Sequence, residues 1–245
     1  MLKIQNLKKH FSGVKAVNNC SFEIKPQAIT ALIGPNGAGK STVFNLVSGI
    51  LKADAGKIIF NNKNITNSSI EKISNSGVSR LFQQSRLFNN LTVQDNFLLA
   101  LNNEDTKFWS SFISLRETSA DKKNKAAKIL KLITMENFAD TLARDLSYGQ
   151  KRLVELGRAI LNPHKFLMLD EPVAGVTPKL REKIAEILLM LKNRKETILL
   201  IEHDMNFTFK IADDIIVLER GKVIAKGKPS EIKDNPKVLE AYLGE

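Results

Sequence analysis

The chain has 245 residues, of which 43% are hydrophobic and 26% are charged, a composition typical of a globular protein rather than of a disordered or fibrous one. It has no run of 18 apolar residues, so we expect no membrane-spanning helix, and a single cysteine, Cys20, excludes an internal disulfide framework and suits a reducing cytosol. The net charge of +11 leaves open attraction to nucleic acid, attraction to an anionic membrane surface, or solubility alone.

The N-terminal part is predicted to form strands with one face in water. Residues 2–7 and 21–25 alternate apolar and polar side chains, as half-buried strands do. Residues 1–6 lack the apolar core of a signal peptide, so we expect no secretory signal. Phe11 lies in a loop between the two strands. It is either a plug of the hydrophobic core or a ring on which a nucleotide base stacks.

A glycine-rich segment follows a buried strand predicted at residues 28–33. Two glycines separated by four residues precede a lysine and a hydroxyl residue in Gly34, Pro35, Asn36, Gly37, Ala38, Gly39, Lys40, Ser41 and Thr42. The glycines let backbone N–H groups face an anion, and the helix predicted after the loop adds its positive dipole end. Lys40 is expected to reach the outer phosphates of a nucleotide, and Ser41 to ligate Mg²⁺. The segment predicts a nucleotide site.

The middle of the chain predicts further strands and then helices. Strands are expected at 56–60 and 78–82, and helices at 93–101 and 122–133. The five lysines of the last helix are expected on a solvated face. Residues 102–121 show no regular pattern, although they hold an apolar cluster around Trp109.

The last hundred residues alternate helices with continuous apolar strands. The expected order is a helix from Ser147 to about 161, a strand at 166–169, a helix at 178–191, a strand at 197–201 and a hairpin over 215–226. Alternation of this kind predicts an α/β fold with a largely parallel sheet covered on both faces.

Polar side chains follow several of the buried strands. Asp170 and Glu171 end one strand, His203 follows the next, and Gln83 follows the strand at 78–82. Ligands of open α/β sheets bind beyond these strand ends. Asp170 suits Mg²⁺, Glu171 suits proton abstraction from an attacking water, and His203 suits orientation of that water. Gln83 suits a Mg²⁺ or water contact.

Ser147 and Gly149 predict a second anion site at a helix N-terminus. One chain needs only one triphosphate cradle, so this second site has a reason only if it serves the nucleotide of another molecule.

Together these residues resemble the ATP-binding subunit of ABC transporters over essentially the whole chain. The family's signature motif is matched by Leu146, Ser147, Tyr148, Gly149 and Gln150, with Tyr148 where glycine is usual. The resemblance identifies Gln83 with the glutamine loop, Asp170 and Glu171 with the Walker B pair, His203 with the switch histidine and Phe11 with the base-stacking aromatic. It implies a head-to-tail dimer in which Ser147 and Gly149 of one chain complete the site built on Lys40 of the other.

The amino-acid sequences of several segments are most similar to those of the branched-chain amino acid transport branch of the family. These segments are 147–150, 174–178, 201–205 and the tail 240–244. The ATPase of lipopolysaccharide export is a second similar relative, which shares the sequence Ala174–Val176 and has a related C-terminal segment. Thr177 stands where the family generally has Asp, which leaves open whether a non-identical partner supplies that Asp.

The sequence therefore predicts a P-loop NTPase (RecA-like) core with an N-terminal antiparallel β subdomain and an inserted helical subdomain. Residues 1–83 and 146–245 are expected to form the core and 84–145 the helical part of a single domain. The implied function is ATP hydrolysis that powers a membrane transporter, with branched-chain amino acid uptake first and lipopolysaccharide-type export as the alternative. A non-transport assembly or regulatory ATPase is a further alternative.

The implied partners are a second ATPase subunit and integral permease subunits at the cytoplasmic face of the cell membrane. Phe88, Leu91 and the cluster at 108–112 are candidates for permease contact. A GTP-binding switch is disfavoured because no Asn-Lys-x-Asp tetrad occurs, and nucleic-acid binding rests on charge alone.

Overall fold

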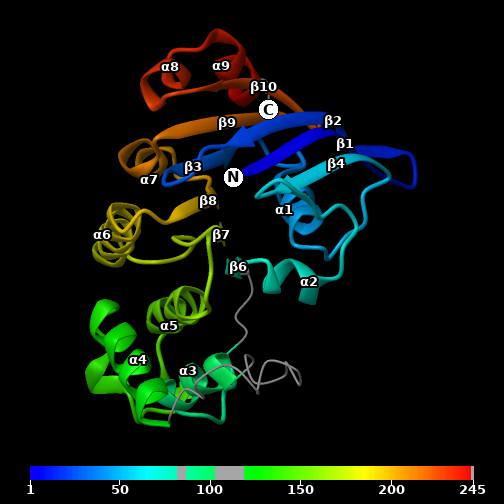
Figure 1. Cartoon of the computed structure of the whole chain (residues 1–245). Helices are drawn as coiled ribbons and strands as arrows, with labels where there is room; N and C mark the ends of the chain where they lie inside the picture. The colour runs from blue at the N-terminus through cyan, green and yellow to red at the C-terminus, as the bar shows by residue number, and fades with distance from the viewer. Residues whose placement is uncertain (82–86, 103–118, 244–245) are drawn as a thin grey trace.

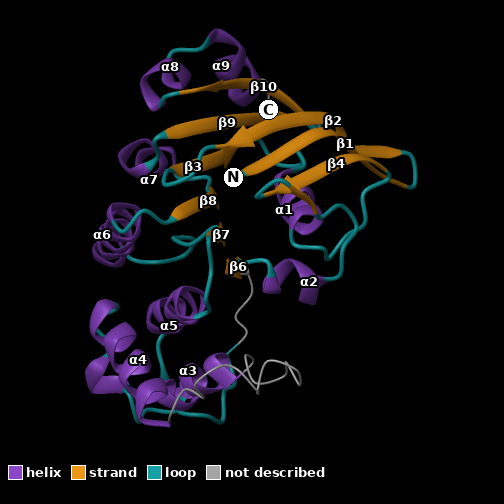
Figure 2. Ribbon diagram, in the orientation of Figure 1, coloured by secondary structure: helices purple, strands orange, loops and turns teal. Residues whose placement is uncertain are grey.

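The fold is built on two β-sheets that lie side by side, with helices on the remaining faces (Figure 1). The computed structural model describes residues 1–81, 87–102 and 119–243. Figure 2 shows strands gathered in the centre and upper right, with helices around them at the left, bottom, top and right.

Within the described ranges, ten strands form the two sheets. The four-stranded antiparallel sheet has the order β2-β1-β4-β5, and the six-stranded sheet has the order β10-β9-β3-β8-β7-β6. The strands are β1 (Leu2–Phe11), β2 (Val14–Ile24), β3 (Ile29–Ile33), β4 (Ala55–Phe60), β5 (Lys63–Asn64), β6 (Val78–Leu81), β7 (Phe166–Asp170), β8 (Thr197–Ile201), β9 (Asp214–Glu219) and β10 (Lys222–Gly227).

The helices lie between the strands and after the last one. They are α1 (Lys40–Val47), α2 (Ile70–Asn75), α3 (Val93–Asn102), α4 (Ser119–Leu132), the 3₁₀ turns η2 (Glu136–Phe138) and η3 (Ala143–Asp145), α5 (Tyr148–Leu161), α6 (Pro178–Asn193), α7 (Met205–Ile211), α8 (Pro229–Lys233) and α9 (Pro236–Leu243). Among the described residues, no helix is long and apolar enough to cross a bilayer.

The six-stranded sheet is parallel except at its β9–β10 hairpin, as predicted. Side chains of β7 alternate between the two faces: Leu167 and Leu169 belong to one buried cluster, and Phe166 and Met168 to the other. Helices α5, α6 and α7 cover the first face, and α1 with the four-stranded sheet covers the second. Both faces are therefore dry, which explains why the central strands read as continuous apolar runs.

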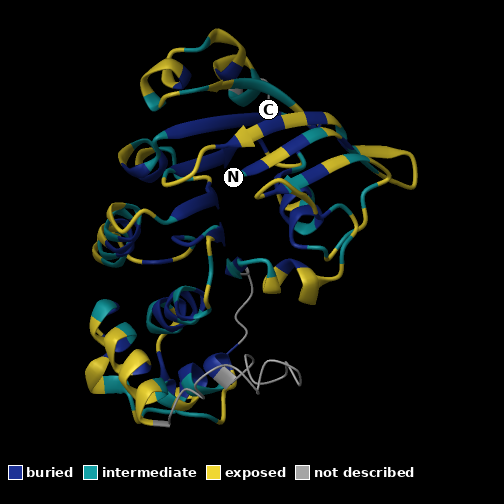
Figure 3. Cartoon of the chain, viewed as in Figure 1, coloured by how far each residue is buried: buried dark blue, intermediate teal, exposed yellow. Residues whose placement is uncertain are grey.

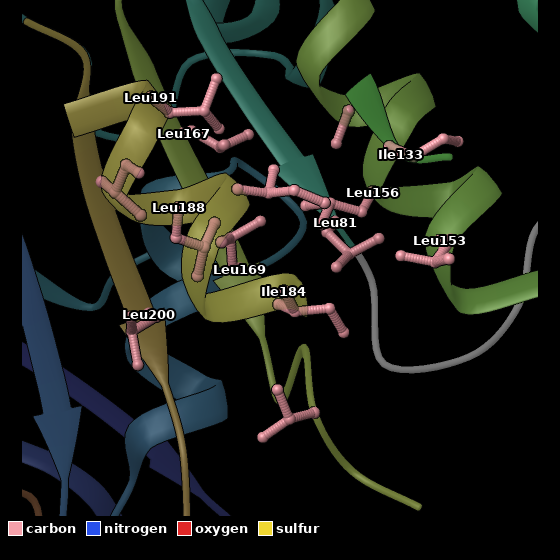
Figure 4. Packing of buried hydrophobic residues seen from close by; sticks show 14 of the residues in the cluster. Leu81, Ile133, Leu153, Leu156, Leu167, Leu169, Ile184, Leu188, Leu191 and Leu200 are labelled. Atoms are coloured by element: carbon pink, nitrogen blue, oxygen red, sulfur yellow. The ribbon is translucent and has the colours of Figure 1, made fainter. Parts of the chain in front are cut away.

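The packing of α5 and α6 on the first face is dominated by leucine and isoleucine (Figure 4). Leu153 and Leu156 of α5 lie in the same cluster as Ile184 and Leu188 of α6. Burying one such side chain contributes about 1.5–3 kcal/mol, so this layer fixes both helices against the strand ends that precede the site.

The antiparallel sheet is larger than the sequence pattern predicts. Strand β1 runs to Phe11 and β2 begins at Val14, so the expected loop around Phe11 is the tip of a hairpin. The register of β1 against β2 shifts between Ile4 and Leu7, and Asn6 and Asn19 have positive φ. These β-bulges interrupt the period-two alternation from which strand length is estimated.

Helices α3 and α4 pack against α5, at the end of the molecule opposite to α8 and α9 (Figure 1). Ala126 and Leu130 of α4 are buried, whereas Lys123, Lys125, Lys128 and Lys131 are exposed and Lys122 is half-buried. The expected solvated lysine face is confirmed, and Figure 3 shows the exposed side of α4 in yellow.

A candidate nucleotide site at the carboxyl ends of the parallel strands

The glycine-rich segment forms the turn between β3 and α1. Gly34, Gly37 and Gly39 all have positive φ, at 146°, 74° and 99°. A Cβ on Gly34 would lie 2.0 Å from the carbonyl oxygen of Leu218, and one on Gly39 would lie 2.2 Å from that of Ala16. Only glycine fits at these two positions, because the loop is wedged between neighbouring backbones.

Lys40 is buried at the first turn of α1, and its ammonium faces the loop. Its Nζ donates to the carbonyl oxygens of Gly34 at 2.6 Å and Pro35 at 2.9 Å. Gly39 caps α1 without a side-chain hydrogen bond. A cation and the N-terminal end of a helix thus meet at one loop, an arrangement that suits a phosphate group.

Asp170 ends β7 as a buried carboxylate that is only half satisfied. Its Oδ2 accepts from Nη2 of Arg80 at 2.8 Å, whereas its Oδ1 has no hydrogen-bond partner among the described residues. Burial raises the pKa of Asp170, and the Arg80 guanidinium opposes that rise. Arg80 also donates to Asn45 Oδ1 and Ser48 Oγ, each at 2.8 Å, which connects the end of β7 to α1.

Glu171 occupies a strained turn directly after β7. Its φ is +49°, a region that costs a residue with a side chain roughly 1–3 kcal/mol and is common at functional sites. Backbone hydrogen bonds hold the turn, with Glu171 N donating to Ile201 O at 3.0 Å and Ala174 N to Glu171 O at 3.2 Å.

Arg152, buried on α5, holds the same turn from the other side. Its Nη2 donates to the carbonyl oxygens of Asp170 at 2.8 Å and Glu171 at 2.7 Å, and its Nε donates to that of Pro172 at 3.3 Å. Its Nη1 pairs with the buried Glu155 at 3.1 Å. One guanidinium therefore fixes three consecutive carbonyl groups.

His203 reaches the carboxylate of Glu171 from the end of β8. Its Nε2 lies 3.0 Å from Glu171 Oε1, with the imidazole about half exposed and the carboxylate mostly covered. Strands β7 and β8 are paired neighbours in the sheet, with Asp170 opposite Ile201. A side chain just beyond one strand end therefore meets one just beyond the other.

Glu202, which follows β8 and precedes His203, is buried. Its Oε1 accepts from Val173 N at 2.9 Å and its Oε2 from His203 N at 3.2 Å. Burial raises the pKa of Glu202 to about 7. Glu202 thus ties the segment after Glu171 to the one that carries His203.

Ser147 begins α5 with a capping box, as the sequence predicts for a helix N-terminus. Gln150 N donates to Ser147 Oγ at 3.3 Å, and Ser147 N donates to Gln150 Oε1 at 2.8 Å. The next residues face the 174–180 segment: Tyr148 Oη donates to Ala174 O at 3.3 Å, and a Cβ on Gly149 would lie 2.6 Å from Leu180 Cδ2. Thr177 caps α6 by accepting from Leu180 N at 3.4 Å.

Phe11 is 43% exposed, so its interpretation as a plug of the core is wrong. Lys9 Nζ lies 5.4 Å from the centre of its ring. Phe88 is also exposed, at 50%, with the Arg158 guanidinium 5.6 Å from its ring centre. Gln83 and the apolar cluster at 108–112 lie outside the described residues.

The structure places the predicted residues in two groups. The glycine loop with Lys40, the Asp170–Glu171 pair and His203 follow β3, β7 and β8, and β8 pairs with both β3 and β7. Ser147 to Gln150 form the N-terminal end of α5, against residues 174–180 of the same chain.

Sequence reasoning missed Arg80 and Arg152, and it placed Glu202 beside His203 at a strand end without giving it a role. The sequence does contain a sign that Arg152 is buried and paired. This residue lies four positions before Leu156, on the apolar stripe of a predicted helix, where a charge needs a buried partner.

Two family models match the chain. One, described as ABC transporter, covers residues 17–174. The other, described as branched-chain amino acid ATP-binding cassette transporter, covers residues 222–245. The chain is 39% identical to the high-affinity branched-chain amino acid transport ATP-binding protein LivG of Escherichia coli (strain K12), over 100% of this chain and 98% of LivG.

Solved structures match over nearly the whole chain as well. A nucleotide-free ATP-binding cassette from an ABC transporter superposes with a TM-score of 0.87 at 36% identity, covering 100% of this chain and 99% of that one. A dimeric cassette in a post-hydrolysis state, bound to ADP and Pi, gives 0.80 at 25% identity, covering 94% and 99%.

Proposed function

The chain belongs to the ABC transporter family of ATP-binding subunits, and from that premise we propose that it energises the uptake of branched-chain amino acids. It is a nucleotide-binding ATPase that powers a transporter. The observation that carries the solute class is the full-length similarity to LivG, reinforced by the C-terminal family match over residues 222–245. That match favours amino acid uptake over the lipopolysaccharide-export alternative.

We assign the phosphates of ATP to the loop of Gly34 to Thr42. In the structure the Lys40 ammonium is held by two loop carbonyls, and phosphate oxygens are stronger acceptors for the same N–H groups. The loop N–H groups and the N-terminal end of α1 supply the remaining donors. Phe11, exposed at the hairpin tip, is assigned to the adenine ring.

The residues present fit a Mg²⁺ ion. Asp170 offers Oδ1, a buried carboxylate oxygen with no partner among the described residues, and Ser41 offers a hydroxyl on the exposed side of α1. Mg²⁺ in such sites keeps several waters and takes one or two protein oxygens besides phosphate, so a cluster of carboxylates is not required. When bound, the ion supplies charge neutralisation at the phosphates. Gln83 is assigned a contact with the Mg²⁺ ion or with a water beside it.

Glu171 is assigned as the general base. Its carboxylate is held by the strained turn behind it and by the imidazole of His203. With ATP in the loop, a water between Glu171 and the terminal phosphate would lose a proton to Glu171 as it attacks. His203 keeps that carboxylate oriented and senses the terminal phosphate.

We further propose a head-to-tail dimer. The loop at Gly34 and the end of α5 at Ser147 belong to different groups within one chain, and the end of α5 suits the nucleotide of a second ATPase subunit through Ser147, Gly149 and Gln150. The relative that is dimeric with ADP and Pi bound supports a dimer. The partner is either a second copy or a related subunit.

Permease subunits are proposed to bind the helical part at 84–145, with residues 1–83 and 146–245 as the core of the same domain. Phe88 is an exposed aromatic on this side. The subunit then lies at the cytoplasmic face of the membrane, where ATP is available.

Uptake of labelled leucine, isoleucine and valine tests the proposal in cells that depend on this subunit. Replacement of the chain by Glu171→Gln is expected to abolish uptake while the complex with the permease stays intact. If uptake of these amino acids persists and that of another solute is lost, the solute assignment is wrong. Recovery of the chain without membrane proteins after gentle solubilisation would favour the non-transport alternative.

A further inference from the structure

Tyr148 replaces the glycine that is usual at its place in the signature motif, and its side chain makes two contacts that glycine lacks. Its hydroxyl donates to the Ala174 carbonyl at 3.3 Å. Its ring lies over Gly175, where a Cβ would be 3.1 Å from Tyr148 Cε1. Gly175 has a φ of +69°, so this position also favours glycine on backbone grounds. Tyr148 and Gly175 are therefore complementary in shape.

The segment that Tyr148 touches is the one that leaves Glu171. Ala174 N donates to Glu171 O at 3.2 Å, and Val176 N donates to Val173 O at 3.4 Å, so residues 171–176 form two consecutive tight turns. These turns end at Thr177, which caps α6. A shift of Ala174 is therefore transmitted to the backbone of Glu171 within one turn.

Helix α5 holds these turns at two places. Arg152 binds the carbonyl groups of residues 170–172 from the buried side. Tyr148, 58% exposed, binds Ala174 one helical turn nearer the N-terminal end of α5. Glu202 holds Val173 through its backbone N–H, and Tyr148 ties the following residue, Ala174, to α5.

We propose that Tyr148 is a positioning residue that fixes residues 173–176 to the N-terminal end of α5, and thereby couples Glu171 to the end of the helix that meets the second subunit's nucleotide. Ser147 and Gly149 flank Tyr148, so a nucleotide that pulls on the end of α5 also moves the ring. The ring and hydroxyl carry that movement to Ala174, and the turn carries it to Glu171. The proposal rests on the proposed function, because it presumes that Glu171 is the base and that α5 meets a second nucleotide.

The first test measures amide hydrogen exchange in the isolated chain, without nucleotide or permease. Tyr148→Gly is expected to raise exchange at Ala174 and Val176 by about fivefold, the loss expected for one net hydrogen bond. Tyr148→Phe keeps the ring and loses the hydroxyl, so a smaller rise is expected. Tyr242→Phe, in α9 at the other end of the sheet, is the matched control and should leave these amides unchanged. Equal exchange in Tyr148→Gly and the parent chain would overturn the contact.

The second test measures ATP hydrolysis by the complex with its permease. Tyr148→Gly is expected to lower kcat about fivefold and to leave the KM for ATP within about twofold, because the ring acts on Glu171 and not on the chain's own phosphate loop. Tyr148→Phe should recover part of kcat. A wild-type kcat in Tyr148→Gly, or a loss confined to KM, would overturn the positioning role. If the parent complex hydrolyses no ATP, the proposed function fails, whereas the exchange experiment still decides whether Tyr148 holds the turn.

Discussion

His203 Nε2 lies 3.0 Å from Glu171 Oε1, so the side chain that follows β8 restrains the side chain that follows β7. Each residue alone is a common strand-end polar group. Their contact arises because β7 and β8 are parallel neighbours whose carboxyl ends coincide. It holds the carboxylate beside the end of β8, the strand that also pairs with β3, which the glycine loop follows.

Glu171→Gln is expected to lower ATP turnover by about a hundredfold or more, because an amide does not accept the proton of the attacking water. Binding of ATP should remain, and the ATP-bound dimer should accumulate. Steady-state hydrolysis, equilibrium nucleotide binding and size-exclusion chromatography check the three parts. Glu136→Gln, at an exposed 3₁₀ turn, is the control with the same chemical change. Unchanged turnover in Glu171→Gln would remove this residue as the base.

Lys40→Ala is expected to weaken ATP binding by about 10- to 100-fold, since charge-assisted hydrogen bonds contribute about 1.5–3 kcal/mol. Titration calorimetry in a Glu171→Gln background measures affinity without turnover. Lys63→Ala, at the exposed first residue of β5, removes the same charge elsewhere and should bind normally. A normal affinity in Lys40→Ala would contradict the phosphate assignment of the loop.

Arg152→Ala is expected to destabilise the fold by about 3–5 kcal/mol, because it leaves Glu155 buried without this partner and removes one hydrogen bond from each of three carbonyl groups. Arg152→Lys keeps the charge and loses the planar fork, so a smaller loss is expected. Urea unfolding measures both. Arg220→Ala, whose side chain is 92% exposed, should change stability by no more than about 0.5 kcal/mol. A similar value for Arg152→Ala would show that the guanidinium does not hold the turn.

His164, just before the amino end of β7, is expected to make the free energy of unfolding depend on pH. Its Nε2 lies 2.8 Å from Glu196 and its Nδ1 2.7 Å from the Asn162 carbonyl oxygen. Burial alone lowers the pKa of His164, but the hydrogen bonds with Glu196 and Asn162 outweigh burial, so the pKa is raised. The stabilisation is therefore complete below the unfolded value of about 6.5 and is lost as pH rises through the folded pKa.

The measurement is the free energy of unfolding of the parent chain minus that of His164→Gln, from about pH 5 to 9. The difference should be largest at the acid end and shrink toward the alkaline end. In a Glu196→Gln background the same difference should vary less with pH. A difference that grows with pH would mean that His164 is held in its neutral form.

Much of the fold was predictable because its patterns are local. The buried strands at β3, β7 and β8 are continuous apolar runs, and Ser147 marks the start of α5. Short helices such as α2 and α7 were missed, although Ser69 and Asp204 cap them. Their few turns are held by tertiary packing, which a periodicity argument does not detect.

In the candidate site, too, local motifs were predictable from the sequence, whereas contacts between distant residues were not. The loop at Gly34 is one contiguous motif, so its residue types and their chemistry follow from the sequence, and the predicted positions of Asp170, Glu171 and His203 follow from strand ends. The contacts of Arg80, Arg152 and Glu202 join residues far apart in the chain, and no local pattern states which carbonyl or carboxylate they meet.

The sequence by itself indicated a phosphate loop, a signature motif and the continuous apolar strands of a parallel sheet, because each of these patterns lies within a few positions of the chain. Only the tertiary structure decided that Phe11 is exposed, that Asp170 pairs with Arg80, and that the Tyr148 hydroxyl meets the Ala174 carbonyl. The reason is physical: strand order and helix packing bring together side chains that are distant along the chain, and contact energies depend on distance in space.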